Sequence, residues 1–182
     1  MGLTEGPSPP RAPHPRGHRW VRVVSVVTAV WTYVTIVIGA DVTASNSSLA
    51  CPSWPTCNGN GLFPDALTNA VLAEFSHRLA ALTLSVLILA LLALVLAYEP
   101  NGRAVRRLGA LSLGLVVLQA ALGGVIIFTQ ADPIVVILHL AVAILIFAVI
   151  LVVALLVNIP HLPPRWRVSL FGEDDAIRAP GP

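Results

Sequence analysis

The sequence predicts an all-α membrane protein, a bundle of four transmembrane helices with both termini in the cytoplasm. Two observations lead to this class. Of the 182 residues, 56% are hydrophobic and only 11% are charged, whereas soluble proteins carry roughly 25% charged residues. The apolar residues also gather in four runs, and each reaches the roughly 20 residues that a helix needs to cross a bilayer. The runs are residues 20–40, 68–98, 108–128 and 134–158.

The first run, 20–40, follows a proline-rich segment, 1–19, that we expect to be a disordered cytoplasmic tail. The run is longer than the roughly 7 to 15 residues of a signal-peptide core, so we interpret it as a retained helix. The second run, 68–98, is longer than a bilayer requires, so its first turns are expected to project from the membrane or lie on its surface. The third and fourth runs, 108–128 and 134–158, complete the bundle.

The distribution of arginine predicts the orientation, because the chain contains no lysine. Ten of its 11 basic residues lie before or at the very start of the first run, between the second and third, or after the fourth. The loops on the opposite side, 41–67 and 129–133, contain none. By the positive-inside rule both termini, including the tail 159–182, are expected in the cytoplasm, and the outer loop 41–67 outside the cell membrane.

Charge and cysteine content exclude several classes of protein. A net charge of +2 without a basic stripe gives no electrostatic footprint for nucleic acid. Two cysteines are too few for a disulfide-rich scaffold, or for a structural zinc site made of sulfur ligands alone. The lipid bilayer is therefore the first partner that the sequence predicts, and nucleic acid is not expected.

Besides Arg22 at the start of the first run, the Asp, Glu, His and Arg residues inside the predicted helices are Glu74, His77 and Arg78 in the second and His139 in the fourth. Such residues are costly in hydrocarbon, so each is a candidate functional residue. Glu74 precedes His77 by three positions and Arg78 by four, which places all three on one flank of a helix. A simple ion pair between Glu74 and Arg78 would account for these two residues without any ligand. It does not explain the histidines.

His77 and His139 are expected at similar depth, because each lies a few turns into a helix that enters from the outer side. Two imidazoles that face each other across a bundle can supply both axial ligands of a haem iron. Small side chains near His77 would leave room for a flat macrocycle, although they also serve ordinary helix packing. They are Ala70, Ala73, Ala80 and Ala81.

The third predicted helix contributes one polar residue deep in its apolar run, Gln119. We expect it to form an interhelical hydrogen bond rather than to bind a metal. The small residues Ala120, Gly123 and Gly124 are expected to serve close helix packing.

The outer loop contains both cysteines, in the segment Cys51-Pro-Ser-Trp-Pro-Thr-Cys57-Asn-Gly59. Thiols oxidise on the non-cytoplasmic side, so we expect a disulfide between Cys51 and Cys57. Two prolines bend the short segment, which can bring the Cα atoms within bridging distance. Two roles remain open, a structural staple and a redox-active pair that exchanges electrons with a partner.

Taken together and in this order, four segments resemble the haem A synthase family. The cysteine loop followed by Glu-x-x-His-Arg is the specific part of the resemblance, which extends over residues 20–158. The segments are the loop 42–59, Glu74-Phe-Ser-His-Arg78, Gln119-Ala-Ala-Leu-Gly-Gly124 and His139-Leu140. Members of the family have eight helices in two similar halves, each holding one haem through a histidine pair. This chain resembles the amino-terminal half.

The resemblance implies a role for each candidate residue. Glu74 is implied as the catalytic carboxylate, and His77 and His139 as the axial ligands of the haem iron. Arg78 is implied to accompany His77 in binding the haem, near a propionate. Cys51 and Cys57 correspond to the family's loop cysteines.

The resemblance also implies an activity and partners. The family oxidises a methyl group of haem O to the formyl group of haem A for cytochrome oxidase assembly, here by two hydroxylations and loss of water. The implied cofactors are haem b, haem O or haem A, and the implied partners are haem O synthase and an electron donor. Because one half offers one haem site, we expect a homodimer or a larger ring of identical chains.

Two other functions compete with this interpretation. A haem b electron carrier with two histidine ligands would use His77 and His139, but it leaves Glu74 and the cysteine loop without a role. A four-helix, quinone-linked thiol oxidoreductase would use Cys51 and Cys57. That chemistry normally requires a second thiol pair, and the sequence has no third cysteine.

Overall fold

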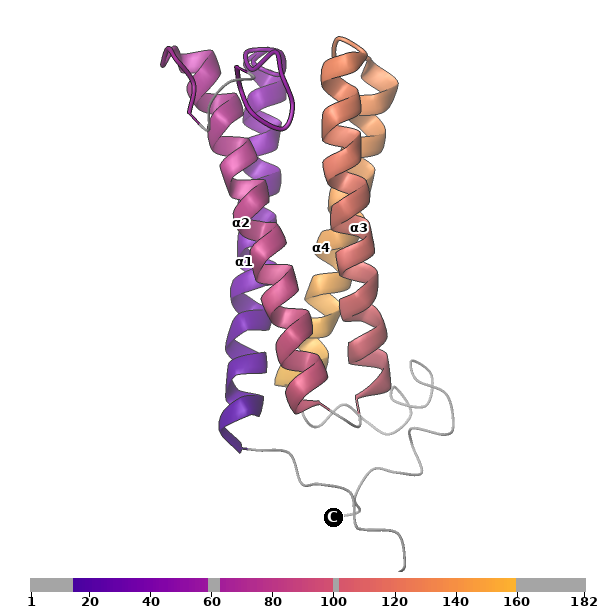
Figure 1. Cartoon of the computed structure of the whole chain (residues 1–182). Coiled ribbons are helices and arrows are strands. Elements are labelled where there is room, and N and C mark those ends of the chain that lie inside the picture. Colours follow the sequence, from indigo (N-terminus) through magenta and orange to yellow (C-terminus); the bar gives the residue numbers. More distant parts are fainter. Residues whose placement is uncertain (1–14, 59–62, 100–101, 160–182) are drawn as a thin grey trace, which may run out of the picture.

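The computed structural model describes residues 15–58, 63–99 and 102–159. Of the expected tails, 1–19 and 159–182, residues 1–14 and 160–182 lie outside the described residues, and 15–19 belong to the first helix rather than to a disordered segment. Within the described ranges the chain forms helices and no strands (Figure 1). The four helices are α1 (Pro15–Ala44), α2 (Asn69–Tyr98), α3 (Arg103–Phe128) and α4 (Pro133–Asn158). Each is long and apolar enough to cross a membrane, which confirms the predicted class of all-α, multi-pass membrane protein.

Two helices extend beyond the apolar runs that predict them. α1 begins at Pro15 and continues to Ala44, whereas its apolar run covers 20–40. α3 begins at Arg103 rather than at Leu108. Arginine is a good helix former, and its long side chain reaches the interface while its backbone stays helical. Hydropathy therefore locates the apolar stretch of a helix but not its ends.

Local hydrogen bonds determine where α2 and α4 begin. The Thr68 hydroxyl accepts a hydrogen bond from the backbone N–H of Val71, at 3.3 Å, and caps α2. The Asp132 carboxylate accepts from the backbone N–H of Ile134, at 2.8 Å, and caps α4. Proline follows Asp132 in the first turn, where its missing N–H costs nothing. Each cap satisfies a donor that the helix itself leaves unpaired.

The helices run up and down in chain order around the bundle. α1 packs against α2 and α4, and α3 packs against the same two helices. In Figure 1, α1 with α2 and α3 with α4 form two pairs that converge where α1 begins and α4 ends. We call this the terminal end. The pairs diverge at the opposite end, which carries the α1–α2 loop and is called the loop end (Figure 1).

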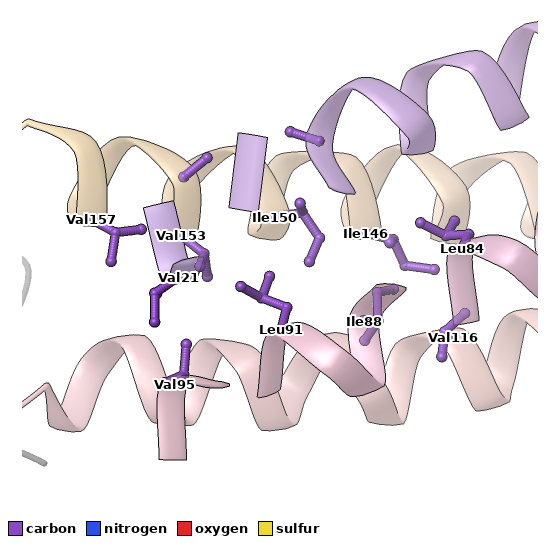
Figure 2. Packing of buried hydrophobic residues seen from close by; sticks show 12 residues of the cluster. Val21, Leu84, Ile88, Leu91, Val95, Val116, Ile146, Ile150, Val153 and Val157 are labelled. Carbon is purple, nitrogen blue, oxygen red and sulfur yellow. The ribbon is translucent and has the colours of Figure 1, made fainter. Parts of the chain in front are cut away.

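The packed core lies in the half of the bundle nearer the terminal end (Figure 2). Every buried residue of α4 lies at or beyond Ile146, so positions 133–145 contribute none. α1 also buries a row of hydroxyl side chains, and that of Thr32, for example, donates to the carbonyl of Thr28 at 2.7 Å. The core residues are Val21, Ala29, Leu84, Ile88, Leu91, Val95, Val116, Ile146, Ile150, Val153, Ala154 and Val157.

A polar contact ties α1 to α2 at the terminal end. His18 pairs with Glu99, and the absence of a side chain at Gly17 lets the Tyr98 ring lie against the α1 backbone. The terminal end is thus closed by both core and surface contacts. The candidate residues lie in the other half.

Candidate functional site

The structure brings the two intramembrane histidines together. His77 of α2 and His139 of α4 face each other with ring centroids 6.5 Å apart and ring planes inclined by 73°. The two residues are 62 positions apart in the sequence, 139 minus 77, so only the fold can place them side by side. The pair lies on the loop-end side of the packed core.

Gly39 of α1 makes room for the His77 imidazole. A Cβ atom at this position would lie 2.7 Å from Cε1 of His77 and 3.2 Å from its Nδ1. Both separations are shorter than van der Waals contact, so the ring occupies the space that any larger residue would need. Gly123 of α3 lies beside the other ring, where a Cβ atom would be 3.6 Å from Cε1 of His139.

Three polar atoms near the pair are buried without a hydrogen-bond partner among the described residues. They are Nδ1 of His77, Nδ1 of His139 and Oε1 of Gln119. Buried polar groups in proteins are nearly always paired, so unpaired ones mark a place where a ligand or water can bind. The side-chain oxygen of Gln119 therefore forms no interhelical hydrogen bond within the described residues.

Glu74 and Arg78 form the expected ion pair one turn apart on α2. Nε of Arg78 donates to Oε1 of Glu74 at 2.8 Å, and the side chains are only 15% and 9% exposed, respectively. The carboxylate lies one turn before His77 on the same helix. The Glu74 carboxylate is thus held next to the histidine pair, and the Arg78 guanidinium neutralises its charge in an environment of low dielectric constant.

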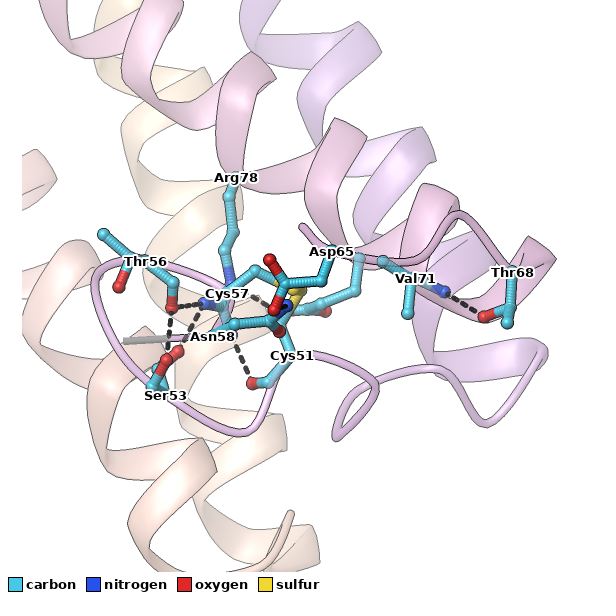
Figure 3. The surroundings of a disulfide bond; sticks show 10 residues. Cys51, Ser53, Thr56, Cys57, Asn58, Asp65, Thr68, Val71 and Arg78 are labelled. Carbon is cyan, nitrogen blue, oxygen red and sulfur yellow. Dashed lines mark hydrogen bonds and ion pairs between the residues drawn. A yellow bond between two sulfur atoms is a disulfide. The ribbon is translucent and has the colours of Figure 1, made fainter. Parts of the chain in front are cut away.

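Arg78 also holds the cysteine loop (Figure 3). Its Nη1 donates to the backbone carbonyls of Ser53, at 2.6 Å, and Thr56, at 2.9 Å, and its Nη2 donates to that of Cys51 at 2.9 Å. With the bond to Glu74, these contacts use four of the five N–H donors of a guanidinium group. Only one N–H donor of Arg78 therefore remains for the contact with a haem propionate that the resemblance implies.

The expected disulfide between Cys51 and Cys57 is present and buried. It closes the segment that Arg78 binds (Figure 3). The same segment carries Trp54, whose indole packs against α3: a Cβ atom at Gly124 would lie 3.3 Å from Cδ2 of Trp54. The loop therefore bridges the two helix pairs at the loop end, from Arg78 on α2 to Gly124 on α3. Both cysteines of the chain are used in this bond.

These residues fit a haem. Two imidazoles on opposite sides of one metal ion, each about 2 Å from it, have ring centroids roughly 6 Å apart, close to the 6.5 Å found here. The described residues contain no cluster of three or more His, Cys, Asp or Glu side chains that would hold a metal. A metal held by His77 and His139 alone would need further ligands, and the iron of a porphyrin brings its own. The packed core also ends before it reaches the pair.

Sequence reasoning named the charged and sulfur-containing residues of this region but missed two neighbours. Gly39 was not singled out, because a glycine in an apolar helix reads as packing and its contact with His77 depends on helix rotation. Trp54 lies within the cysteine loop, but the sequence pattern assigns it no function. Gly124 is expected to serve helix packing, and the atoms nearest to a Cβ at this position are those of the Trp54 indole.

Fold and site define a multi-pass, four-helix membrane protein with a facing histidine pair and a disulfide-closed loop at the same end of the bundle. Residues 65–171 match the COX15-CtaA family, described as cytochrome oxidase assembly protein. The chain belongs to this family.

Curated relatives carry the name haem A synthase. The protein of Lysinibacillus sphaericus is 31% identical over 141 residues, which are 77% of this chain and 46% of that protein. The protein of Bacillus pumilus is 33% identical over 139 residues, 75% of this chain and 45% of its own length. That of Shouchella clausii is 36% identical over 104 residues, 57% of this chain and 34% of its own. The chain thus spans about half the length of the first two relatives. No solved structure gives a significant match.

Proposed function

We propose that this protein binds haem between His77 and His139 and acts as a homo-oligomer in the oxidation of the haem O methyl group to the formyl group of haem A. One observation carries the proposal: the two imidazoles face each other 6.5 Å apart across the bundle. Membership of the cytochrome oxidase assembly family supports it, as do relatives named haem A synthase.

His77 and His139 would hold the iron. When bound, a haem supplies the oxidative chemistry, while the protein supplies ligation, orientation and electrostatics. The glycines at positions 39 and 123 leave space between the helices for the two imidazole rings. Gln119 adds a buried amide oxygen next to the pair, and this oxygen is available to a bound group because it has no partner among the described residues.

Glu74 is the proposed catalytic carboxylate. It is buried, with 6% of the residue exposed, and lies one turn from His77. In a site of low dielectric constant its charge would stabilise positive charge at the reacting methyl carbon, or its oxygen would take up a proton released there. Arg78 fixes the carboxylate through a bond to one oxygen, Oε1.

The visible spectrum of the purified protein tests haem binding. We expect a sharp absorption band on reduction, typical of two histidine ligands, and its loss in His77→Ala and in His139→Ala. His18→Ala is the matched control, because His18 lies at the terminal end and pairs with Glu99. A colourless wild-type protein, or a band that persists in both site variants, contradicts the ligand assignment.

Replacement of Glu74 tests the chemistry separately. Glu74→Gln keeps the size of the side chain and an oxygen that accepts from Arg78 but removes the charge. With haem O supplied, we expect haem A formation to fall at least about a hundredfold while the bound haem is retained. Extraction and chromatography of the pigments measure both quantities. Undiminished haem A formation would rule out this role, and Glu99→Gln controls for loss of a carboxylate elsewhere.

An electron carrier with haem b is the second candidate, because the histidine pair alone is enough for it. Its signature is a protein that contains only haem B even when haem O is supplied. In that case Glu74→Gln would change neither the pigment nor its amount. The same extraction therefore separates the two functions.

A further inference from the structure

A groove on the outer face of the bundle lies at the terminal end, away from the histidine pair. It is lined by Arg19, Arg22, Val23, Val26, Val27 and Asn158. Five of these belong to α1 at spacings of three and four residues, so they form one stripe along the helix. Asn158, the last residue of α4, forms the opposite edge.

The two arginines of the groove have no acidic partner among the residues that the structure describes. The ion pairs within the described residues are His18 with Glu99 and Glu74 with Arg78, and neither includes Arg19 or Arg22. Nε of Arg22 donates to Oδ1 of Asn158 at 3.3 Å, which orients the guanidinium toward the groove. Asn158 is itself held by a bond from its Nδ2 to the carbonyl of Ala154, at 2.8 Å. Two positive charges are thus presented side by side at one rim.

The other end of the groove is apolar. Val23, Val26 and Val27 are between 45% and 46% exposed, and they continue the stripe from the arginines toward the middle of the membrane-spanning helix. Trp20, 60% exposed, lies beside the arginines, in the kind of position where aromatic residues mark the membrane interface. The groove therefore has a charged rim at headgroup level and an apolar floor at acyl-chain level.

We propose that this groove binds an anionic phospholipid. Its phosphate would accept hydrogen bonds from Arg19 and Arg22, since guanidinium groups bind phosphate in a bidentate manner. One acyl chain would lie along Val23, Val26 and Val27. Basic sites between helices near the membrane interface are suited to such headgroups. The site is separate from the histidine pair, so it stands whether or not the proposed function is correct.

Native mass spectrometry of the delipidated full chain tests the site. The probes are phosphatidylglycerol and phosphatidylcholine with identical acyl chains. We expect the wild type to bind phosphatidylglycerol at least tenfold more tightly, and the variant Arg19→Gln with Arg22→Gln to lose about thirtyfold in affinity for it. Arg103→Gln with Arg107→Gln is the control, because it removes the same charge from exposed positions of α3 at the same end.

Two further measurements separate the outcomes. Val26→Phe fills the apolar floor without changing charge and should weaken binding, whereas Val30→Phe, on the same helix but outside the groove, should not. Glycerol phosphate should not compete, because it lacks the acyl chain. The proposal is overturned if the α3 variant loses as much affinity as the groove variant, if both lipids bind equally, or if glycerol phosphate displaces the lipid.

Discussion

Gly39 of α1 lies directly against the imidazole of His77, and this contact shows how one missing side chain orients another. Helix α1 contributes no ligand to the proposed haem site, yet its backbone forms the wall behind one histidine. The same holds for α3, where Gly123 lies beside His139. At this scale the site depends on the residues that leave space as much as on those that fill it.

Gly39→Ala should displace His77. The added Cβ atom would lie 2.7 Å from Cε1 of the ring, so the imidazole must rotate or shift. We expect haem affinity to fall at least about tenfold, because ligand geometry must be held within roughly 0.5 Å for full function. Titration of the apoprotein with haem, followed by absorption, measures the change.

Gly114→Ala is the control for Gly39→Ala. A Cβ atom at Gly114 of α3 meets nothing within 4 Å. This variant should bind haem like the wild type and gain up to about 1 kcal/mol in stability, because alanine is the better helix former. Equal haem affinity in both variants would mean that Gly39 does not shape the site.

The loop between α1 and α2 is the element that connects the two helix pairs. Arg78 binds three of its backbone carbonyls, and Trp54 carries the contact across to Gly124 of α3. The Cys51–Cys57 disulfide closes the segment between these contacts. The loop and the ion pair with Glu74 thus share one guanidinium group.

Arg78→Lys should loosen the loop while it keeps the charge next to Glu74. A single ammonium group cannot reproduce the planar fork that binds three carbonyls and a carboxylate at once. We expect the disulfide to be reduced several times faster by a water-soluble phosphine, as measured by mass-tag labelling of the thiols. Arg107→Lys, exposed at the terminal end, should leave this rate unchanged. Equal rates in both variants would show that Arg78 does not protect the bond.

The whole molecule divides into a packed half and a half that carries the site. The cluster of buried apolar residues drawn in Figure 2 lies on the terminal side, where the helix pairs converge (Figure 1). Close packing there holds the four helices in register. Their divergence at the loop end leaves the histidines of two different helices facing each other.

Loss of packing in the core should destabilise the bundle far more than loss of the same kind of side chain facing lipid. Ile88 is 1% exposed and Leu89 is 51% exposed, on adjacent positions of α2. Ile88→Ala should lower the free energy of unfolding by about 2 kcal/mol, the low end for a buried isoleucine, since lipid replaces water as the competing solvent. Leu89→Ala should cost less than about 0.5 kcal/mol. Denaturant unfolding in mixed micelles measures both, and equal losses would contradict the assignment of the core.

The complete molecule is expected to be an assembly of identical chains. Because one histidine pair offers a single haem site, we expect two or more identical chains to assemble with closed symmetry. Native mass spectrometry from nanodiscs should give masses at multiples of the 19.2 kDa chain. A mass of one chain, at concentrations where haem A is formed, would contradict the oligomer.

The sequence alone determined the class of fold and the chemistry of the candidate residues. Four apolar runs predict four helices because hydrocarbon forces every backbone group to pair within its own segment. Glu74, His77, Arg78 and His139 stand out for the same reason, since ionisable side chains are costly there. Oxidation of the cysteines was predicted from the expected place of their loop on the non-cytoplasmic side, and the structure contains the bond.

Only the tertiary structure decided which residues meet. The distance between His77 and His139, the space at Gly39 and the contact of Trp54 with Gly124 depend on how four helices rotate and tilt against one another. Hydropathy is nearly uniform around a membrane helix, so it does not say which face points inward. Arg78 bonds both Glu74 and the α1–α2 loop, and this arrangement likewise depends on the position of a loop that has no regular secondary structure. Those are properties of packing, and no local pattern encodes them.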